Sequence, residues 1–143
     1  MIRVDKITYF ILQETLLEYA NNQLDNISLW GIINSNNNNS NIRIDKFLDL
    51  IDNPNKKYIK KISSMSTFGG GCLPTLETES DSIEIKIPGF TSDKLYTSFI
   101  NSKIPIVGTI VNDSYRLDFK TIFDTDLQFI AESINQISNK KGI

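Results

Sequence analysis

Apolar residues recur at helical spacing near the start of the chain, and this pattern predicts a helix over residues 4–20. The apolar stripe is wide, because further apolar residues flank those at the core-facing positions. Its members are Ile7, Tyr9, Phe10, Ile11, Leu12, Leu16, Leu17 and Ala20. A stripe of this width predicts contact on more than one side of the helix, or apolar surface left for a partner.

The pattern weakens over residues 21–41. An apolar island, 27–33, surrounds Trp30, and the polar run that follows, 35–40, predicts a flexible loop because it has no apolar side chains to bury. Residues 42–52 then predict a short amphipathic helix, which ends before a proline.

After residue 56 the pattern is typical of strands. Residues 57–67 contain β-forming side chains, and residues 82–87 alternate strictly, with Ile83 and Ile85 on one face and Glu84 on the other. This alternation predicts a strand with one buried side.

The rest of the chain predicts a helix over 91–101, a strand over 106–111, a strand over 115–119 and a last helix. Thr125 and Gln128 have the spacing of a capping box at the start of that last helix. The buried stripe expected for it is Leu127, Ile130, Ala131, Ile134 and Ile137. A two-residue turn at 112–113 requires its flanking strands to be antiparallel.

This order predicts an α+β fold, with a small antiparallel or mixed four-stranded sheet covered by helices on one face. We divide the chain into a helical connecting segment with an Asn-rich loop, residues 1–55, and a small α+β domain, residues 56–143.

The composition of the chain excludes several classes of function. The chain has 143 residues, a formal net charge of -2, no histidine and one cysteine. It therefore lacks the excess of basic residues on which broad nucleic-acid binding depends, any histidine-based catalytic set, any His-ligated metal site and any intrachain disulfide. We expect no signal peptide and no membrane-spanning segment, and hence a cytoplasmic protein.

Two features are candidates for binding. The run Gly69, Gly70 and Gly71 exposes backbone N–H groups to an anion or forms a bend or bulge, and it matches neither the P-loop nor the dinucleotide pattern. Arg3, beside Lys6, suits bidentate anion recognition or lies in a solvated terminus. We assign no catalytic residue and no metal ligand.

Four segments, in order, resemble the C-terminal part of bacterial L-seryl-tRNA(Sec) selenium transferase, the selenocysteine synthase family. They are Arg3–Lys6, which resembles R-V-D-K; Ser66–Pro74, which resembles S-x-x-G-G-G-S-x-P; Pro105–Ile110, which resembles P-[IV]-[IV]-G-R-I; and Leu117–Thr121, which resembles L-D-L-R-T. A related pyridoxal-phosphate lyase of the same superfamily has much of this region in common.

The resemblance implies the connecting helix and small C-terminal domain of a fold-type-I pyridoxal phosphate enzyme. In that family a lysine of the large domain holds the cofactor, and the enzyme converts seryl-tRNA(Sec) to selenocysteinyl-tRNA(Sec) with selenophosphate. The resemblance assigns Arg3 to substrate or anion binding. It places Gly69, Gly70 and Gly71 near the ligand or a subunit interface.

The chain departs from the family in three ways. The segment that carries the Schiff-base lysine has no counterpart here, Thr109 replaces an arginine that grips substrate anions, and Cys72 replaces a serine. We therefore expect no cofactor on this chain alone. The first hypothesis is a C-terminal fragment that is not catalytic alone, with the missing large domain or copies of itself as partners and tRNA as a partner of the full-length family only. The alternatives are a stand-alone, non-catalytic oligomerisation module and a piece of a related lyase.

Overall fold

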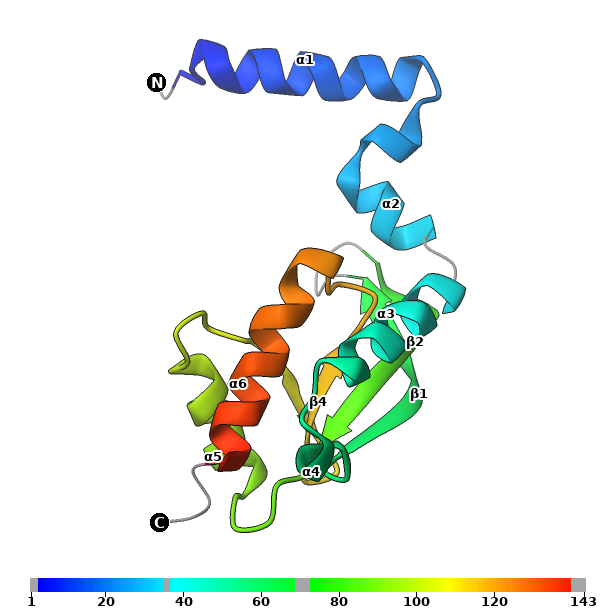
Figure 1. Cartoon of the computed structure of the whole chain (residues 1–143). Coiled ribbons are helices and arrows are strands. Elements are labelled where there is room, and N and C mark those ends of the chain that lie inside the picture. The colour runs from blue at the N-terminus through cyan, green and yellow to red at the C-terminus, as the bar shows by residue number, and fades with distance from the viewer. Residues whose placement is uncertain (1–2, 35–36, 69–72, 140–143) are drawn as a thin grey trace. The chain divides into compact units, whose positions relative to one another are not determined.

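The computed structural model describes residues 3–34, 37–68 and 73–139, and it divides the chain into two compact units, Met1–Ser35 and Asn36–Ile143 (Figure 1). This division falls earlier in the chain than the 55/56 boundary expected from the sequence. The reason is that a helix before residue 55 packs on the sheet of the second unit through buried Ile44 and Phe47.

The first unit is helical. It contains α1 (Lys6–Ala20), a 3₁₀ turn η1 (Leu24–Asn26) and α2 (Ser28–Asn34). The carboxylate of Asp5 caps α1 by accepting from the backbone N–H of Thr8 at 2.8 Å, and this bond lowers the pKa of Asp5. The indole N–H of Trp30 in α2 donates to the hydroxyl of Tyr19 at 2.8 Å. The predicted helix over 4–20 is confirmed, and the apolar island around Trp30 forms α2.

The second unit is built on a four-stranded sheet in which every pair of neighbouring strands is antiparallel. Its order is β1 (Ile59–Phe68), β2 (Leu73–Ile85), β4 (Ser114–Asp118) and β3 (Thr109–Val111). The turn between β3 and β4 is the expected two-residue one, because Asn112 and Asp113 both have positive φ. The predicted α+β fold is confirmed.

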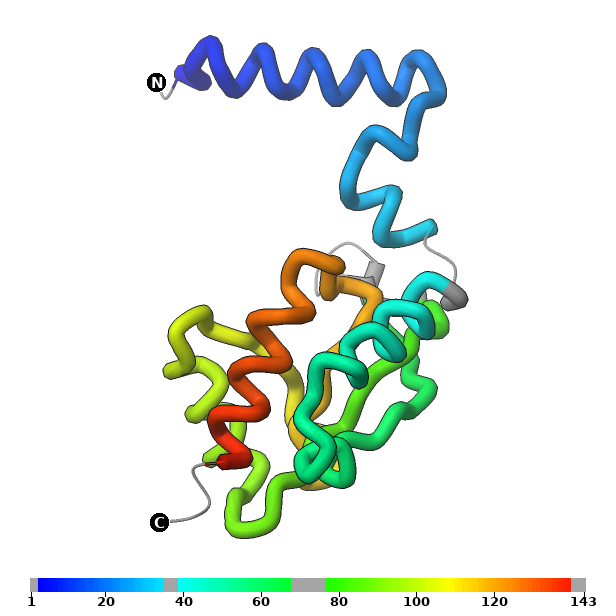
Figure 2. Tube along the Cα trace, viewed as in Figure 1, coloured from blue at the N-terminus to red at the C-terminus, as the bar shows by residue number. Residues whose placement is uncertain are grey.

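Helices cover the face of the sheet that carries Ile83, Ile85, Tyr115 and Leu117. They are α3 (Asn37–Asp49), α4 (Asn53–Lys56), α5 (Ser92–Ile100) and α6 (Leu127–Asn139), the last preceded by the turn η2 (Asp124–Asp126). Between these helices and the sheet lies one core, which includes all five residues of the predicted α6 stripe. Figure 2 shows how the chain passes from α3 through the sheet and returns in α6, which contacts α3.

One α6 side chain joins distant parts of the second unit. The side-chain oxygen of Asn135 accepts from the backbone N–H of Asp52 at 3.1 Å and from the amide of Asn55 at 3.2 Å, and its nitrogen donates to the carbonyl of Leu50 at 3.3 Å. These bonds attach the last helix to the turn between α3 and α4.

Three local predictions were wrong. The polar run is not a loop where it is described, because α3 begins at Asn37 and buries Ser40 against the unit. The strand expected over 106–111 is shorter: residues 106–108 form an extended strap beside β4, held by the hydroxyl of Tyr115, which donates to the carbonyl of Ile106 at 3.0 Å. The cap before α6 is formed by Asp126, whose carboxylate accepts from the N–H of Phe123 at 3.1 Å, and not by Thr125.

Candidate functional site

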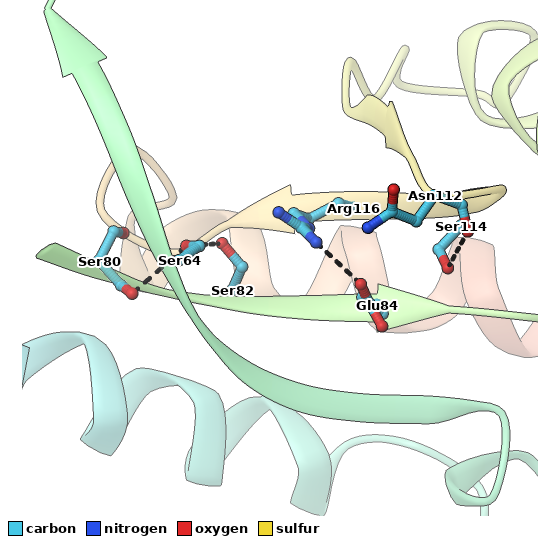
Figure 3. Close-up of polar contacts among 7 residues, drawn as sticks. All are labelled: Ser64, Ser80, Ser82, Glu84, Asn112, Ser114 and Arg116. Atoms are coloured by element: carbon cyan, nitrogen blue, oxygen red, sulfur yellow. Dashed lines mark hydrogen bonds and ion pairs between the residues drawn. The ribbon is translucent and has the colours of Figure 1, made fainter. Parts of the chain in front are cut away.

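Polar side chains gather on the face of the sheet that points away from the core. Because side chains alternate along a strand, burial of Ile83 and Ile85 on one face places Ser80, Ser82 and Glu84 on the other. We call this surface the polar face, and Figure 3 shows part of it. Its members are Lys60, Ser64 and Ser66 of β1, Thr78, Ser80, Ser82 and Glu84 of β2, Thr109 of β3, Arg116 and Asp118 of β4, and Lys120 just beyond β4.

A row of charges crosses the polar face at right angles to the strands. Lys60 is paired in register with Glu84, Glu84 with Arg116, and Arg116 with Thr109. The guanidinium of Arg116 donates through Nη2 to Oε1 of Glu84 at 2.8 Å, and the two side chains are 21% and 19% exposed. The Nε of Arg116 is buried without a hydrogen-bond partner. This row therefore contains an arginine that a cross-strand carboxylate holds in place.

Next to the charged row, hydroxyl groups converge on one carboxylate. Asp118 accepts hydrogen bonds from the hydroxyls of Ser66 and Ser80 and from the backbone N–H of Lys120, the last at 2.9 Å. The hydroxyls of Ser64 and Ser82 lie 2.6 Å apart. Each hydroxyl that reaches Asp118 uses its proton to satisfy the carboxylate, so this cluster fixes β1, β2 and β4 against one another.

Lys120 is a buried lysine whose amine group is hydrogen-bonded within the unit. Its Nζ donates to the hydroxyl of Thr78 at 2.9 Å and to the carbonyl of Glu79 at 3.3 Å. A lysine that binds pyridoxal phosphate must present a free amine to an open cavity. The Lys120 amine is buried and hydrogen-bonded, so it does not present such a free amine.

The polar face is suited to binding more than to proton transfer. The carboxylate of Asp118, which the hydroxyls of Ser66 and Ser80 reach, is already satisfied by three donors. Within the described ranges no group of three or more potential metal-ligating side chains occurs. The partly exposed Arg116 and the exposed Lys60 are cations, which suit an anionic or polar partner surface.

The predicted site residues do not come together in one described place. Arg3 lies exposed in the first unit, two residues before the cap of α1. Gly69, Gly70 and Gly71, with Cys72, lie outside the described residues. Thr109 is exposed at the start of β3, directly opposite Arg116 in register.

The sequence reasoning missed Arg116 and the serine–aspartate cluster. A signal was present, because Ser80, Ser82 and Glu84 continue the alternation read over 82–87 toward the start of β2. The pairing partners of these residues lie on β1 and β4, and a pattern within one strand does not identify them.

A second exposed surface belongs to the first unit. None of the residues 3–34 is buried, and α1 exposes large apolar side chains along its whole length. They are Ile7, Tyr9, Phe10, Ile11, Leu12, Leu16, Leu17 and Tyr19, each 46–72% exposed. Such a surface marks an interaction site. None of the helices that the structure describes has the length and apolar character needed to span a bilayer.

The described elements define a small α+β domain with a helical extension. A profile of L-seryl-tRNA selenium transferase matches residues 1–123, and the chain belongs to this family. It is 31% identical over 137 residues to the L-seryl-tRNA(Sec) selenium transferase of Aliarcobacter butzleri. This alignment covers 96% of the chain and 30% of that protein.

Two further relatives give the same coverage. The enzyme of that name from Campylobacter jejuni is 33% identical over 144 residues, and the one from Sulfurimonas denitrificans is 28% identical over 143 residues. Each alignment covers 97% of this chain but 30% of the relative. The chain therefore spans less than a third of the length of the curated relatives it matches.

Proposed function

We propose that this chain is the connecting helix and small domain of a selenocysteine-synthase-like enzyme and is not catalytic alone. The observation that carries the proposal is the family match along almost the whole chain combined with coverage of 30% of each relative. The full protein would bind pyridoxal phosphate, work in the cytoplasm as an oligomer, and convert seryl-tRNA(Sec) to selenocysteinyl-tRNA(Sec) with selenophosphate. The cofactor would supply the electron sink, and the protein would supply position and charge.

In this proposal the polar face lies against the larger part of the enzyme. A sheet face that carries Lys60, Glu84 and Arg116 in one row offers directional contacts to a polar surface, whereas an exposed apolar face would offer none. Arg116 gives that contact a fixed cation, because Glu84 restricts its side chain.

We further propose that Arg3 binds an anion of the substrate and that the run Gly69–Gly71 approaches the ligand or a neighbouring subunit. Arg3 precedes the Asp5 cap and is exposed, so its guanidinium is open to such a group.

The lack of independent catalysis is tested by incubating the purified chain with pyridoxal phosphate, reducing with borohydride and mapping modified lysines by mass spectrometry. We expect weak, scattered labelling of exposed lysines, because the buried Lys120 ammonium is held by Thr78 and Glu79. The full-length Aliarcobacter butzleri enzyme serves as the positive control, with one dominant labelled lysine. Stoichiometric labelling of one lysine in this chain would contradict the proposal.

Membership of a larger enzyme is tested by complementation. The Aliarcobacter butzleri enzyme is truncated to remove the part that aligns with this chain, and the remainder is co-expressed with the chain. We expect selenocysteinyl-tRNA(Sec) to form with the two pieces together and with neither alone. The double variant Arg116→Gln/Glu84→Gln removes both charges of the cross-strand pair together and should reduce assembly.

A further inference from the structure

A cavity of about 260 Å³ lies where three segments of the second unit meet. These segments are the end of β2 with the turn that follows it, the start of α5, and the turn between β3 and β4. We call this cavity the turn pocket. Its volume is below the range of pockets that hold drug-sized ligands, so it suits a smaller molecule.

One wall of the turn pocket is apolar, and a tight turn sets its shape. The backbone N–H of Phe90 donates to the carbonyl of Ile87 at 3.0 Å, which closes a four-residue turn. Pro88 and Gly89 occupy the two central positions, and Gly89 has a φ of 89°, so this is the sequence arrangement of a type II turn. The turn contributes Ile87, Pro88 and Phe90 to the lining, and Leu95 of α5 completes the apolar wall.

A carboxylate is held at the turn pocket by a buried hydroxyl. The side chain of Ser92, a residue that is 8% exposed, donates to Oδ1 of Asp113 at 2.9 Å. Ser92 begins α5 and Asp113 lies in the turn between β3 and β4, so this bond joins two of the three segments. Among the described residues, no second hydrogen bond and no ion pair reaches this carboxylate. It is therefore oriented and still able to accept from a ligand.

The turn pocket also has a cation among its lining residues. Lys86 is exposed and follows directly on the end of β2. Within the described part of the chain, its ammonium group forms no ion pair, either with Asp113 or with another carboxylate. Its flexible four-carbon stem lets the ammonium group approach a ligand. One small cavity is thus lined by two opposite charges that do not neutralise each other.

We propose that the turn pocket binds the zwitterion of a free α-amino acid with an apolar side chain. The ammonium group of the ligand donates to Asp113, its carboxylate accepts from Lys86, and its side chain lies against the apolar wall. An amine or an acid alone satisfies one of the two charges, whereas an α-amino acid carries both on one carbon atom. The inference rests on the residues of this cavity and does not depend on the enzymatic proposal.

The test is a titration of the isotope-labelled full chain with L-leucine, followed by the amide shifts in nuclear magnetic resonance spectra. We expect saturable shifts at residues 86–92 and at Asp113. Two analogues of the same shape separate the two charges, because isocaproate lacks the ammonium group and leucinamide lacks the carboxylate. Each should bind about tenfold more weakly than leucine, since one charge-assisted hydrogen bond is lost.

Charge-removing variants assign each contact to one residue. Asp113→Asn keeps an oxygen for the hydroxyl of Ser92, and asparagine tolerates the φ of 55° at this position. It should weaken leucine binding about tenfold and should not weaken isocaproate binding. Lys86→Met keeps the stem and should weaken leucine binding without weakening that of leucinamide. The matched control is Asp93→Asn, which removes a carboxylate of α5 outside this cavity and should leave all three affinities unchanged.

Thermal unfolding supplies a second measurement on the same proteins. Leucine should raise the unfolding midpoint of the wild type, because a ligand that binds only the folded state stabilises it, and should raise that of Asp113→Asn less. The absence of saturable shifts with leucine would overturn the proposal. Equal affinities for leucine and its two analogues would also overturn it, because they would show apolar contact only. So would an Asp113→Asn variant that binds leucine as tightly as the wild type.

Discussion

The two units of the chain place similar apolar side chains in opposite surroundings. In the second unit, Phe47 and Phe99 are fully buried, and seventeen apolar residues form one core. In the first unit, Phe10 is 63% exposed and none of the described residues is buried. The difference shows that apolar content alone does not define a folding unit. The second unit buries its own apolar side chains, whereas the described residues of the first unit leave theirs exposed.

The arrangement of apolar residues within each helix explains this difference. In α6 they lie on one stripe, so a single sheet covers them. In α1 they lie on two opposite stripes, and one neighbour cannot cover both. A lone helix of 15 residues is only marginally stable in water, so α1 gains from its contacts with the turn η1 and with Trp30 of α2.

The largest expected effect comes from matched phenylalanine truncations. Phe47→Ala removes a ring that is fully buried and lies 5.4 Å from the ring of Phe119, and we expect it to lower the free energy of unfolding by about 3–5 kcal/mol. Phe10→Ala should change it by less than about 0.5 kcal/mol. Urea unfolding of the core measures both, and equal losses would remove the distinction between the units.

An intermediate effect is expected from two glycine substitutions. A Cβ on Gly108 would lie 2.5 Å from Cζ of Tyr115 and 2.6 Å from the backbone oxygen of Arg116, so Gly108→Ala should cost about 1–3 kcal/mol. Gly31 in α2 has open space around it, and Gly31→Ala should raise helix stability by up to about 1 kcal/mol.

Urea midpoints report the Gly108 change, and far-ultraviolet circular dichroism reports the Gly31 change. A midpoint that is unaffected by Gly108→Ala would mean that the strap at residues 106–108 moves freely from β4.

The smallest effect distinguishes two tyrosines at neutral pH. Tyr115→Phe removes the buried bond to the carbonyl of Ile106 and should cost about 1 kcal/mol, whereas Tyr19→Phe removes an exposed acceptor and should cost less than about 0.5 kcal/mol. Urea unfolding at neutral pH measures the two costs.

The variants of Tyr115 and Tyr19 should also differ in how their stability depends on alkaline pH. Burial, and then the neighbouring Tyr96, raise the pKa of Tyr115 in the folded state. Above about pH 10 the unfolded state loses this proton while the folded state keeps it, so stability falls with rising pH by about 1.4 kcal/mol per unit. Tyr115→Phe should flatten this alkaline slope and Tyr19→Phe should not. The same slope in Tyr115→Phe and wild type would show that Tyr115 is not its source.

Much of the second unit could be predicted from the sequence, because its elements are encoded by local periodicity. The stripe of α6 and the alternation around Ile83 gave the correct elements and the correct buried faces. The start of α3 could not be predicted in this way. Asn37 to Ser40 have poor helix propensity, and they are helical because the amphipathic turns that follow dock Ile44 and Phe47 on the sheet.

The candidate site was less predictable than the fold. Arg116 and Asp118 gain their partners from β2 and β1, so their roles depend on strand register across 32 to 52 residues of sequence. Residues 106–108, before β3, contain β-forming side chains and therefore predict a strand. In the structure the carbonyl of Ile106 accepts a hydrogen bond from the side chain of Tyr115 instead of from a neighbouring strand.

The side chain of Asn135 has a consequence for the synthesis of the chain. Its hydrogen-bond partners precede it by 80 to 85 residues, so the contacts that close the second unit form only when α6 has left the ribosome. Helix α1 leaves the ribosome before α6 does, because it precedes α6 in the chain. During translation, the apolar side chains of α1 are therefore made before the core of the second unit can form.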